Sequence, residues 1–224
     1  MKITHLGQAG LMVKTGNMTV IVDPYLSDSV GAVDPQKHRR VPVDESLFDI
    51  RPNVLVFTHD HLDHHDPETA KRILKTHAGV TVLAPASVWQ KVRQHGGDHN
   101  YVLLDRFSQW TEGGVRFSAV PAAHSDAAAI GVVVETEGKT LYITGDTVYN
   151  TSVLAALPKT IDVVFLPVNG VGNNMNAADA ARFVRDCGAK LAVPMHVGLF
   201  DDLTGDILPA KNKRVLAAYE SMEV

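Results

Sequence analysis

Short runs of apolar residues, bounded by glycine, proline, asparagine or aspartate, recur along the whole chain and predict β-strands. The first three runs follow one another closely, with only turn residues between them, and indicate a meander. The predicted strands cover residues 2–7, 11–16, 18–24, 53–57, 80–85, 101–105, 115–122, 129–138, 139–146, 161–168 and 190–196.

Longer segments with helix-start or helix-stop residues lie between some of these strands and predict α-helices. One of them has Pro67 at a tolerated first position, Glu68 in its first turn and Gly79 at its end. The segment Tyr25–Ile50 carries no such signal and is expected to be irregular. Helices are predicted over residues 67–79, 86–97, 151–159, 176–188 and 211–222, the last as a terminal helix.

The order of these elements favours a layered architecture. Strands come first, then β-α-β-α, then further strands, and finally β-α-β. Neither a Rossmann alternation nor an all-β sandwich has this mixture, whereas two sheets packed on each other with helices outside would fit it. No repeat, low-complexity tract or linker interrupts the chain, so we expect a single domain over residues 1–224.

The composition is that of an ordinary globular protein, with 45% hydrophobic and 21% charged residues. A net charge of −4 argues against a nucleic-acid partner, which usually needs a basic face. Cys187 is the only cysteine, so no internal disulfide can form. The apolar runs are too short to span a bilayer and no signal peptide is visible, so we expect a cytoplasmic protein without membrane contact.

Eleven histidines are the one unusual feature of the composition, and four of them lie in FTHDHLDHHDP, residues 57–67. His59 and His61 are two apart in a segment expected to be extended, so their side chains should point the same way. Asp63 and His64 follow as the chain turns, and can face a second point. Imidazole and carboxylate groups suit zinc and similar divalent ions, and four ligands so close in sequence favour two ions. A solvated histidine-rich loop is the alternative.

Three further polar residues, His124, Asp146 and His196, each lie just beyond a separate predicted strand. Strand ends that meet along one edge of a sheet are where active sites are usually built. We therefore expect these side chains to complete the set of metal ligands. Gly145, next to Asp146, would allow a close approach of the backbone.

In these residues the chain resembles the metallo-β-lactamase superfamily. The pattern THDHLDH, then a lone histidine, then TGDT, then a histidine at the end of a strand occurs in the order of that family. The resemblance implies an α/β fold of the four-layer αββα type. It also implies one ion held by His59, His61 and His124, a second held by Asp63, His64 and His196, and Asp146 as a bridge between them.

Within the superfamily the chain is most similar to the L-ascorbate-6-phosphate lactonase branch and related metal-dependent hydrolases, through HHDP, TGDTVYN and PVNGVGNNMNAADA. This resemblance implies manganese as the metal, whereas the wider superfamily implies zinc. It also implies a small-molecule substrate, such as a sugar lactone or lactone phosphate. A homo-oligomer is left open.

Two divalent ions about 3.5–4 Å apart would activate a bridging hydroxide, which would attack an ester-like bond. Asp63 and Asp146 would then be catalytic residues as well as ligands. Covalent catalysis is not expected, because no GxSxG motif occurs and Cys187 has no evident base. The alternatives are a phosphodiesterase for small molecules or phospholipids and, in another class, an iron-binding redox protein or a non-catalytic metal-binding protein.

Four residues outside the ligand set are assigned further roles. Asp23 and Thr58 are expected to support the ligand loop by hydrogen bonds, with a turn residue and a strand end as the alternatives. Asn173 and Asn174 are expected to contact the substrate, unless they only form a turn before a helix that Asn176 caps.

A local basic run occupies residues 34–42 of an otherwise acidic protein. It would present Lys37, Arg39 or Arg40 to a phosphate or carboxylate of the substrate. A solvated loop is the alternative.

Overall fold

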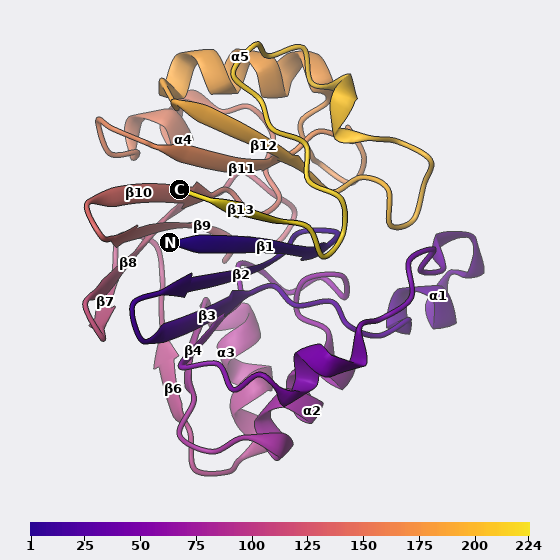
Figure 1. Cartoon of the computed structure of the whole chain (residues 1–224), viewed down its shortest axis with the longest axis vertical. Helices are drawn as coiled ribbons and strands as arrows, with labels where there is room; N and C mark the ends of the chain where they lie inside the picture. The colour runs from indigo at the N-terminus through magenta and orange to yellow at the C-terminus, as the bar shows by residue number, and fades with distance from the viewer.

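The computed structural model describes residues 1–224, which form four layers (Figure 1). Two β-sheets pack face to face, and helices cover the outer side of each. Helices α4 (Thr151–Ala155) and α5 (Ala177–Cys187) lie over one sheet, and α2 (Pro67–Thr76) and α3 (Ala86–Val92) lie over the other. The predicted αββα sandwich is confirmed.

The first sheet has seven strands in the order β13-β1-β2-β3-β4-β5-β6. Strands β13, β1, β2 and β3 pair antiparallel, and the strands from β3 to β6 pair parallel. The bounds are β1 Lys2–Gly7, β2 Gly10–Thr15, β3 Met18–Val22, β4 Val54–Val56, β5 Thr81–Ala84, β6 Asn100–Leu103 and β13 Ser221–Glu223.

The second sheet has six strands in the order β12-β11-β10-β9-β8-β7. Strands β7 to β10 pair antiparallel, whereas β10, β11 and β12 pair parallel. The bounds are β7 Gln109–Glu112, β8 Val115–Pro121, β9 Ile130–Thr136, β10 Lys139–Ile143, β11 Val163–Pro167 and β12 Leu191–Met195. The remaining helices are α1 Ser29–Val33 and the 3₁₀ turns Pro35–Lys37, Glu45–Asp49, Arg93–His95 and Gly205–Ile207.

Three hydrophobic clusters hold the layers together. The central cluster contains 24 buried residues from both sheets, among them Val54 and Phe117. A second cluster packs Ile73 of α2 and other helix residues against the first sheet, and a third packs Phe183 of α5 against the second sheet. The inner parallel strands are therefore covered on both faces, which is why they are apolar throughout rather than alternating.

The two longer helices begin where the capping residues predict. The carboxylate of Asp66 accepts hydrogen bonds from the backbone N–H groups of Glu68 and Thr69, before α2. The side chain of Asn176 caps α5 in the same way, and Gly188 ends α5 in the left-handed conformation. These caps fix the direction in which each helix leaves the edge of its sheet.

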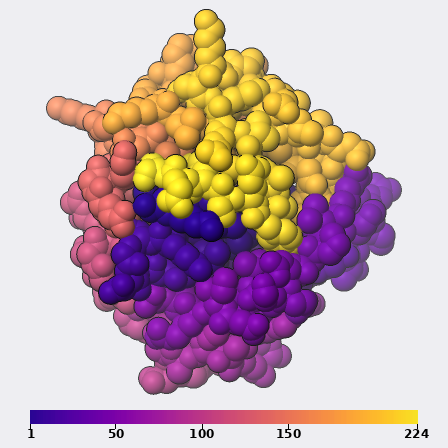
Figure 2. Space-filling view, in the orientation of Figure 1, coloured from indigo at the N-terminus to yellow at the C-terminus, as the bar shows by residue number.

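The predicted terminal helix over residues 211–222 is wrong, because this segment has irregular structure and ends in β13. Strand β13 pairs with β1 and covers its edge, and Met222 is buried in the central cluster. The C-terminal residues lie next to the N-terminal residues on the face shown in Figure 2. Local helix propensity is outweighed here by the burial of Leu216 and Met222 and by strand pairing.

Replacing Met222 with alanine should lower the free energy of unfolding by about 2–5 kcal/mol, because a core side chain is removed. Met222 is only 2% exposed and lies opposite Ile3 in the pairing of β13 with β1. Urea unfolding measures the change, with the exposed neighbour Glu223→Ala as the control. Equal stability of both variants would contradict the placement of β13.

Two other elements had no sequence prediction. Helix α1 and the 3₁₀ turns Pro35–Lys37 and Glu45–Asp49 lie within the segment expected to be irregular, and α1 projects from the side of the sandwich (Figure 1). Strand β7 is a half-exposed edge strand, so its apolar signal is weak. None of the helices has the length and apolar character needed to cross a membrane.

Candidate metal centre

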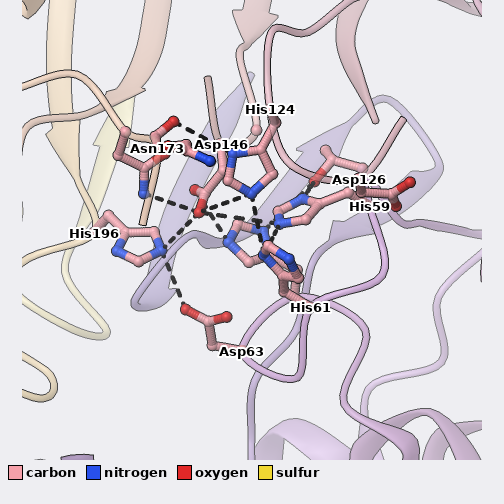
Figure 3. A network of polar contacts seen from close by, with 12 residues as sticks. His59, His61, Asp63, His124, Asp126, Asp146, Asn173 and His196 are labelled. Carbon is pink, nitrogen blue, oxygen red and sulfur yellow. Dashed lines mark hydrogen bonds and ion pairs between the residues drawn. The ribbon is translucent and has the colours of Figure 1, made fainter. Parts of the chain in front are cut away.

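The residues expected to bind metal converge at one edge of the sandwich (Figure 3). Four come from the loop between β4 and α2, and the other three follow β8, β10 and β12. Strand β4 ends at Val56, so His59 and His61 lie in a bend and not in an extended segment. Their rings nevertheless face the same point, because the loop folds back on itself.

The nitrogens of His59, His61 and His124 form what we call the three-histidine set. Nδ1 of His61 lies 3.1 Å from Nε2 of His59 and 3.1 Å from Nε2 of His124. Oδ2 of Asp146 lies 4.0 Å from Nε2 of His59 and 3.9 Å from Nε2 of His124. All four ligand atoms lie within 4.8 Å of one another.

In each ring of this set, the second nitrogen, which is not the proposed ligand atom, lies next to a separate polar group. Nδ1 of His59 lies 3.0 Å from the hydroxyl of Thr58, and Nε2 of His61 lies 3.3 Å from the hydroxyl of Ser125. Nδ1 of His124 lies 3.3 Å from the carbonyl oxygen of Asn173. A partner at the outer nitrogen fixes ring orientation, as is usual for histidines that bind metal.

Asp63, His64 and His196 form a second group, which we call the Asp63 set. Nε2 of His196 lies 3.1 Å from Oδ2 of Asp63 and 3.3 Å from Oδ2 of Asp146. Nε2 of His64 lies 3.2 Å from Oδ1 of Asp146. Asp146 therefore faces both sets: its Oδ1 lies next to His64, and its Oδ2 lies between His196 and the rings of His59 and His124.

Asp23 and Thr58 lie directly behind the two sets and are fully buried. Asp23 accepts hydrogen bonds from the backbone N–H and the hydroxyl of Thr58, and its Oδ2 lies 2.8 Å from Nδ1 of His64. Because the Thr58 hydroxyl hydrogen is directed at Asp23, the ring N–H of His59 donates to that hydroxyl oxygen. One carboxylate thus orients a histidine from each set.

Gly145 is required for the approach of the Asp146 loop. Its φ is +58°, and a Cβ there would lie 2.9 Å from Cβ of Thr58 and 3.0 Å from the carbonyl oxygen of Ile130. Both contacts are too close for any other residue, so the glycine lets two loops from different sheets touch.

Gln8, in the turn after β1, was not assigned a role from the sequence. It is buried, its Nε2 donates to Oδ2 of Asp63 at 2.9 Å, and the same atom lies 3.0 Å from Nδ1 of His196. The side chain of Asn169 lies 3.0 Å from the same His196 nitrogen. The only signal for Gln8 was a polar residue between the glycines of the LGQAG segment.

Asp126 was also not assigned. Its carboxylate accepts hydrogen bonds from the backbone N–H of Asp60 and from the hydroxyl of Ser87. It thereby attaches the loop after β8 to the loop after β4, which carry ligands of the same set. Its position two residues after His124 was the only sequence signal.

Four of the seven non-glycine residues with positive φ surround the two sets: Gln8, Asp23, Asn173 and His196, with φ between 44° and 65°. Such conformations cost energy and persist where the surrounding contacts enforce them. Their concentration here indicates that the fold holds these loops in geometry that their own sequences do not favour.

Buried histidines and carboxylates in the Asp63 set shift one another's pKa values. Burial opposes the protonation of His64, but Asp146, Asp23 and Asp63 outweigh it and hold its pKa well above the ordinary value. Burial also opposes protonation of His196, yet Asp146 and Asp63 raise its pKa to about 10. In the metal-free protein both histidines are therefore charged at neutral pH, and these protons balance the buried carboxylates.

Two histidines of the three-histidine set, His59 and His124, have lowered pKa values instead. Burial, followed by the charge of His64, holds the pKa of His59 well below its ordinary value. Burial likewise lowers the pKa of His124. These rings are neutral at pH 7, with their inner nitrogens available as ligands.

The donor sets fit two divalent cations. Ligand atoms around one tetrahedral zinc ion, with bonds of about 2.0–2.1 Å, lie roughly 3.3 Å apart, close to the separations in the three-histidine set. In the Asp63 set, Nε2 of His64 and Oδ1 of Asp146 are fully buried without a hydrogen-bond partner, although they lie 3.2 Å apart. A cation bound next to both atoms would provide the partner that each of them needs.

Filling the Asp63 set with Zn²⁺ or Mn²⁺ should release about two protons at pH 7, and filling the three-histidine set should release fewer. His64 and His196 must lose their protons to bind, because their pKa values are raised, so affinity at the Asp63 set should increase as pH rises toward 10. Calorimetric titration in buffers of different ionisation enthalpy counts the protons. Equal proton release at both binding steps would contradict this difference.

Asn173 and Asn174 both contact proposed metal ligands. The carbonyl of Asn173 faces His124, and Nδ2 of Asn174 donates to Oδ2 of Asp146 at 2.9 Å. Asn174 also lines the cavity next to Asp146, whereas Asn173 does not. Contact with substrate stays a prediction for both residues, and Asn174 is the one that lines the cavity.

The expectation that Arg39 and Arg40 reach the substrate needs correction. The guanidinium of Arg39 donates to the carbonyls of Val41 and Tyr25 and to the hydroxyl of Tyr219, which ties the basic run to the C-terminal segment. Arg40 pairs with Asp202 at the surface. Neither lines the cavity, and Lys37 is the only basic residue of this run that does.

Several known proteins are similar to this chain. A metal-dependent hydrolase of Geobacillus thermodenitrificans, of the group named UPF0173, is 28% identical over the full length of both chains. One of Oenococcus oeni is 28% identical, over 92% of this chain and 90% of that protein.

Solved structures with the same fold include a metallo hydrolase of the archaeon Ignicoccus hospitalis and a protein of Veillonella parvula described as "a possible metal-dependent hydrolase". The first has a TM-score of 0.77 at 19% identity and covers 100% of this chain and 98% of that chain. The second has a TM-score of 0.79 at 20% identity and covers 100% and 99%. Residues 18–197 match the family model described as "Beta-lactamase superfamily domain". This match contains both ligand sets, and the chain belongs to the β-lactamase superfamily.

Proposed function

We propose that this protein is a metal-dependent hydrolase that opens an ester-like bond, with a lactone as the favoured substrate. The observation that carries the proposal is the sharing of Asp146 by two sets of ligand atoms, with Nε2 of His64 and Oδ1 of Asp146 buried 3.2 Å apart. Two divalent ions bound there would polarise the substrate carbonyl and make water nucleophilic at neutral pH.

The protein's own residues supply orientation and proton transfer. Oδ2 of Asp63 is held by Gln8 and His196, which leaves Oδ1 as the oxygen that would accept a proton from the attacking water. Asp146 lies between the two sets and lines the same cavity as Asp63. Water adds across the acyl C–O bond of the ring, the ring oxygen takes up a proton, and the product is a hydroxy acid.

A nucleophilic side chain is not part of the proposal. Cys187 lies in α5, in an outer layer, and burial raises the pKa of its thiol. It lines neither the cavity nor the ligand sets. The curated relatives that are similar over the full chain carry the name metal-dependent hydrolase, which supports the same reaction class.

The ligand sets are compatible with zinc and with manganese, because imidazole and carboxylate bind both. We propose two ions per chain and a small-molecule substrate, and neither nucleic acid nor a membrane as the partner. The net charge of −4 agrees with this choice of substrate.

Metal analysis combined with a hydrolysis screen tests the proposal. The purified protein is assayed with lactones, lactone phosphates and a chromogenic phosphodiester, after zinc or manganese is restored. About two ions per chain and turnover of lactones are expected. Turnover of the phosphodiester alone would reject the lactone, and oxygen-dependent activity with bound iron would reject hydrolysis.

A further inference from the structure

A cavity of about 520 Å³ opens beside the two ligand sets. This volume is in the range of small-molecule sites. Its inner end is formed by Asp63, Asp146 and His196. Its outer part is formed by α1 and the turn after it, by the loop after β11 and by the loop after β12. The reacting bond of the substrate would lie at the inner end, next to the ligand sets. The outer part would then contact the rest of the substrate molecule.

Apolar side chains from separate segments line the outer part. They are Val30 and Val33 of α1, Leu62, Val171 and Phe200. Val33 is 79% exposed and Val171 is 59% exposed, among the few large hydrophobic residues that face solvent. Exposed apolar side chains that meet at one cavity indicate a ligand that covers them.

The charged residues of the outer part do not match an anionic group. Lys37 is the only lysine or arginine in the lining, and its Nζ lies 3.3 Å from the carboxylate of Asp34, which also lines the cavity. Asp201 adds a second carboxylate, which accepts hydrogen bonds from the backbone of its own loop. A phosphate would need unpaired arginine or lysine donors, and Arg39 and Arg40 of this segment are bound elsewhere.

We infer that the substrate of this site has an uncharged, apolar group beyond its reacting bond, such as an alkyl chain on a lactone ring. Val33 and Val171 contact that group, and a phosphorylated lactone is a poor substrate. This inference rests on the proposed hydrolase function and specifies its substrate class.

A series of lactones with the same ring and alkyl substituents of increasing length tests the inference. Each methylene placed on the apolar wall should raise kcat/KM by roughly fourfold until the cavity is filled. The double variant Val33→Ser, Val171→Ser should lose most of this gain, so that kcat/KM no longer rises with chain length. Phe107→Ser is the matched control, because Phe107 is 74% exposed and does not line the cavity.

Binding provides a readout that does not depend on turnover. Alkyl-substituted five-membered lactams have the same shape and an unreactive amide, so calorimetry can follow their binding to the metal-loaded protein. The heat-capacity change of binding should become more negative with chain length, because apolar surface is buried. In the Val33→Ser, Val171→Ser variant the heat-capacity change of binding should depend much less on chain length.

The outcomes separate the inference from the proposed function. Lactone turnover that ignores chain length, or that is faster with a phosphorylated lactone, overturns the inference and leaves the hydrolase proposal standing. Turnover of no ester or lactone overturns the hydrolase proposal, and the inference with it. A chain-length gain that persists in the double variant also overturns the inference.

Discussion

Replacing Asp146 with asparagine should reduce hydrolysis by at least about 10³-fold, more than the 10–100-fold typical of residues that only orient a ligand. Asp146 contacts His64 and His196 of one set and lies about 4 Å from two rings of the other. The amide removes a negative charge from both sets at once. Asn174 donates to Oδ2, so the new amide oxygen should face Asn174 and its NH₂ group should face His64.

The same variant should bind less metal, since an NH₂ group cannot serve as a ligand. Mass-spectrometric metal analysis after dialysis, together with kcat/KM, measures both effects. Asp201→Asn is the matched control, because Asp201 lines the cavity but belongs to neither set. Unchanged metal content and turnover in the Asp146 variant would reject this assignment of the site.

Replacing Asp23 with alanine should lower both stability and metal affinity, although Asp23 is not a ligand. The carboxylate is fully buried and accepts from the backbone and hydroxyl of Thr58 and from His64. Its loss leaves these buried donors unpaired, which should cost about 3–5 kcal/mol of unfolding free energy. The φ of +44° adds strain for alanine, whereas asparagine tolerates this conformation.

Metal affinity distinguishes this effect from a simple loss of stability. Without Asp23, His64 loses its orienting partner, so metal binding at the Asp63 set should weaken about 10–100-fold. Asp66→Ala is the matched control: Asp66 is equally buried, and its loss as the cap of α2 should cost about 0.5–2 kcal/mol. Metal affinity reduced equally in both variants would show that Asp23 acts through stability alone.

The chemistry of the site was predictable because it is encoded locally. Each proposed ligand directly follows an apolar strand or lies within one short loop, so residue type and position make it a candidate, and the family resemblance completes the set. The αββα layers were predictable for a related reason, since strand and helix signals follow from patterns of a few residues. The start of α5 at Asn176 is an example, because a cap acts within its own turn.

The reasoning that placed His59 and His61 on one face was less successful. It assumed an extended segment, and the structure has a bend. Their rings meet because Asp23 and Thr58 hold the loop from behind, and Asp126 holds it from the side. The ligand types could be chosen from sequence, but the backbone path between them could not.

Arg39 shows a second limit of local patterns. Its charge and its place in a basic run favour an anionic ligand. In the structure its guanidinium is occupied by Tyr25 and Val41 nearby and by Tyr219, which is 180 residues away. Whether an arginine side chain is available to a ligand depends on hydrogen-bond partners that can lie far from it in the sequence.

By itself, then, the sequence determined most of the strands and the longer helices, which side chains are available as ligands and which class of fold they suit. Those features depend on residue type, capping and periodicity over short distances. Only the tertiary structure decided that β13 replaces the terminal helix and that Gln8 holds Asp63 and His196. It alone also decided that the outer cavity is apolar. Gln8 and His196 are 188 residues apart, and such contacts exist only once both sheets are packed.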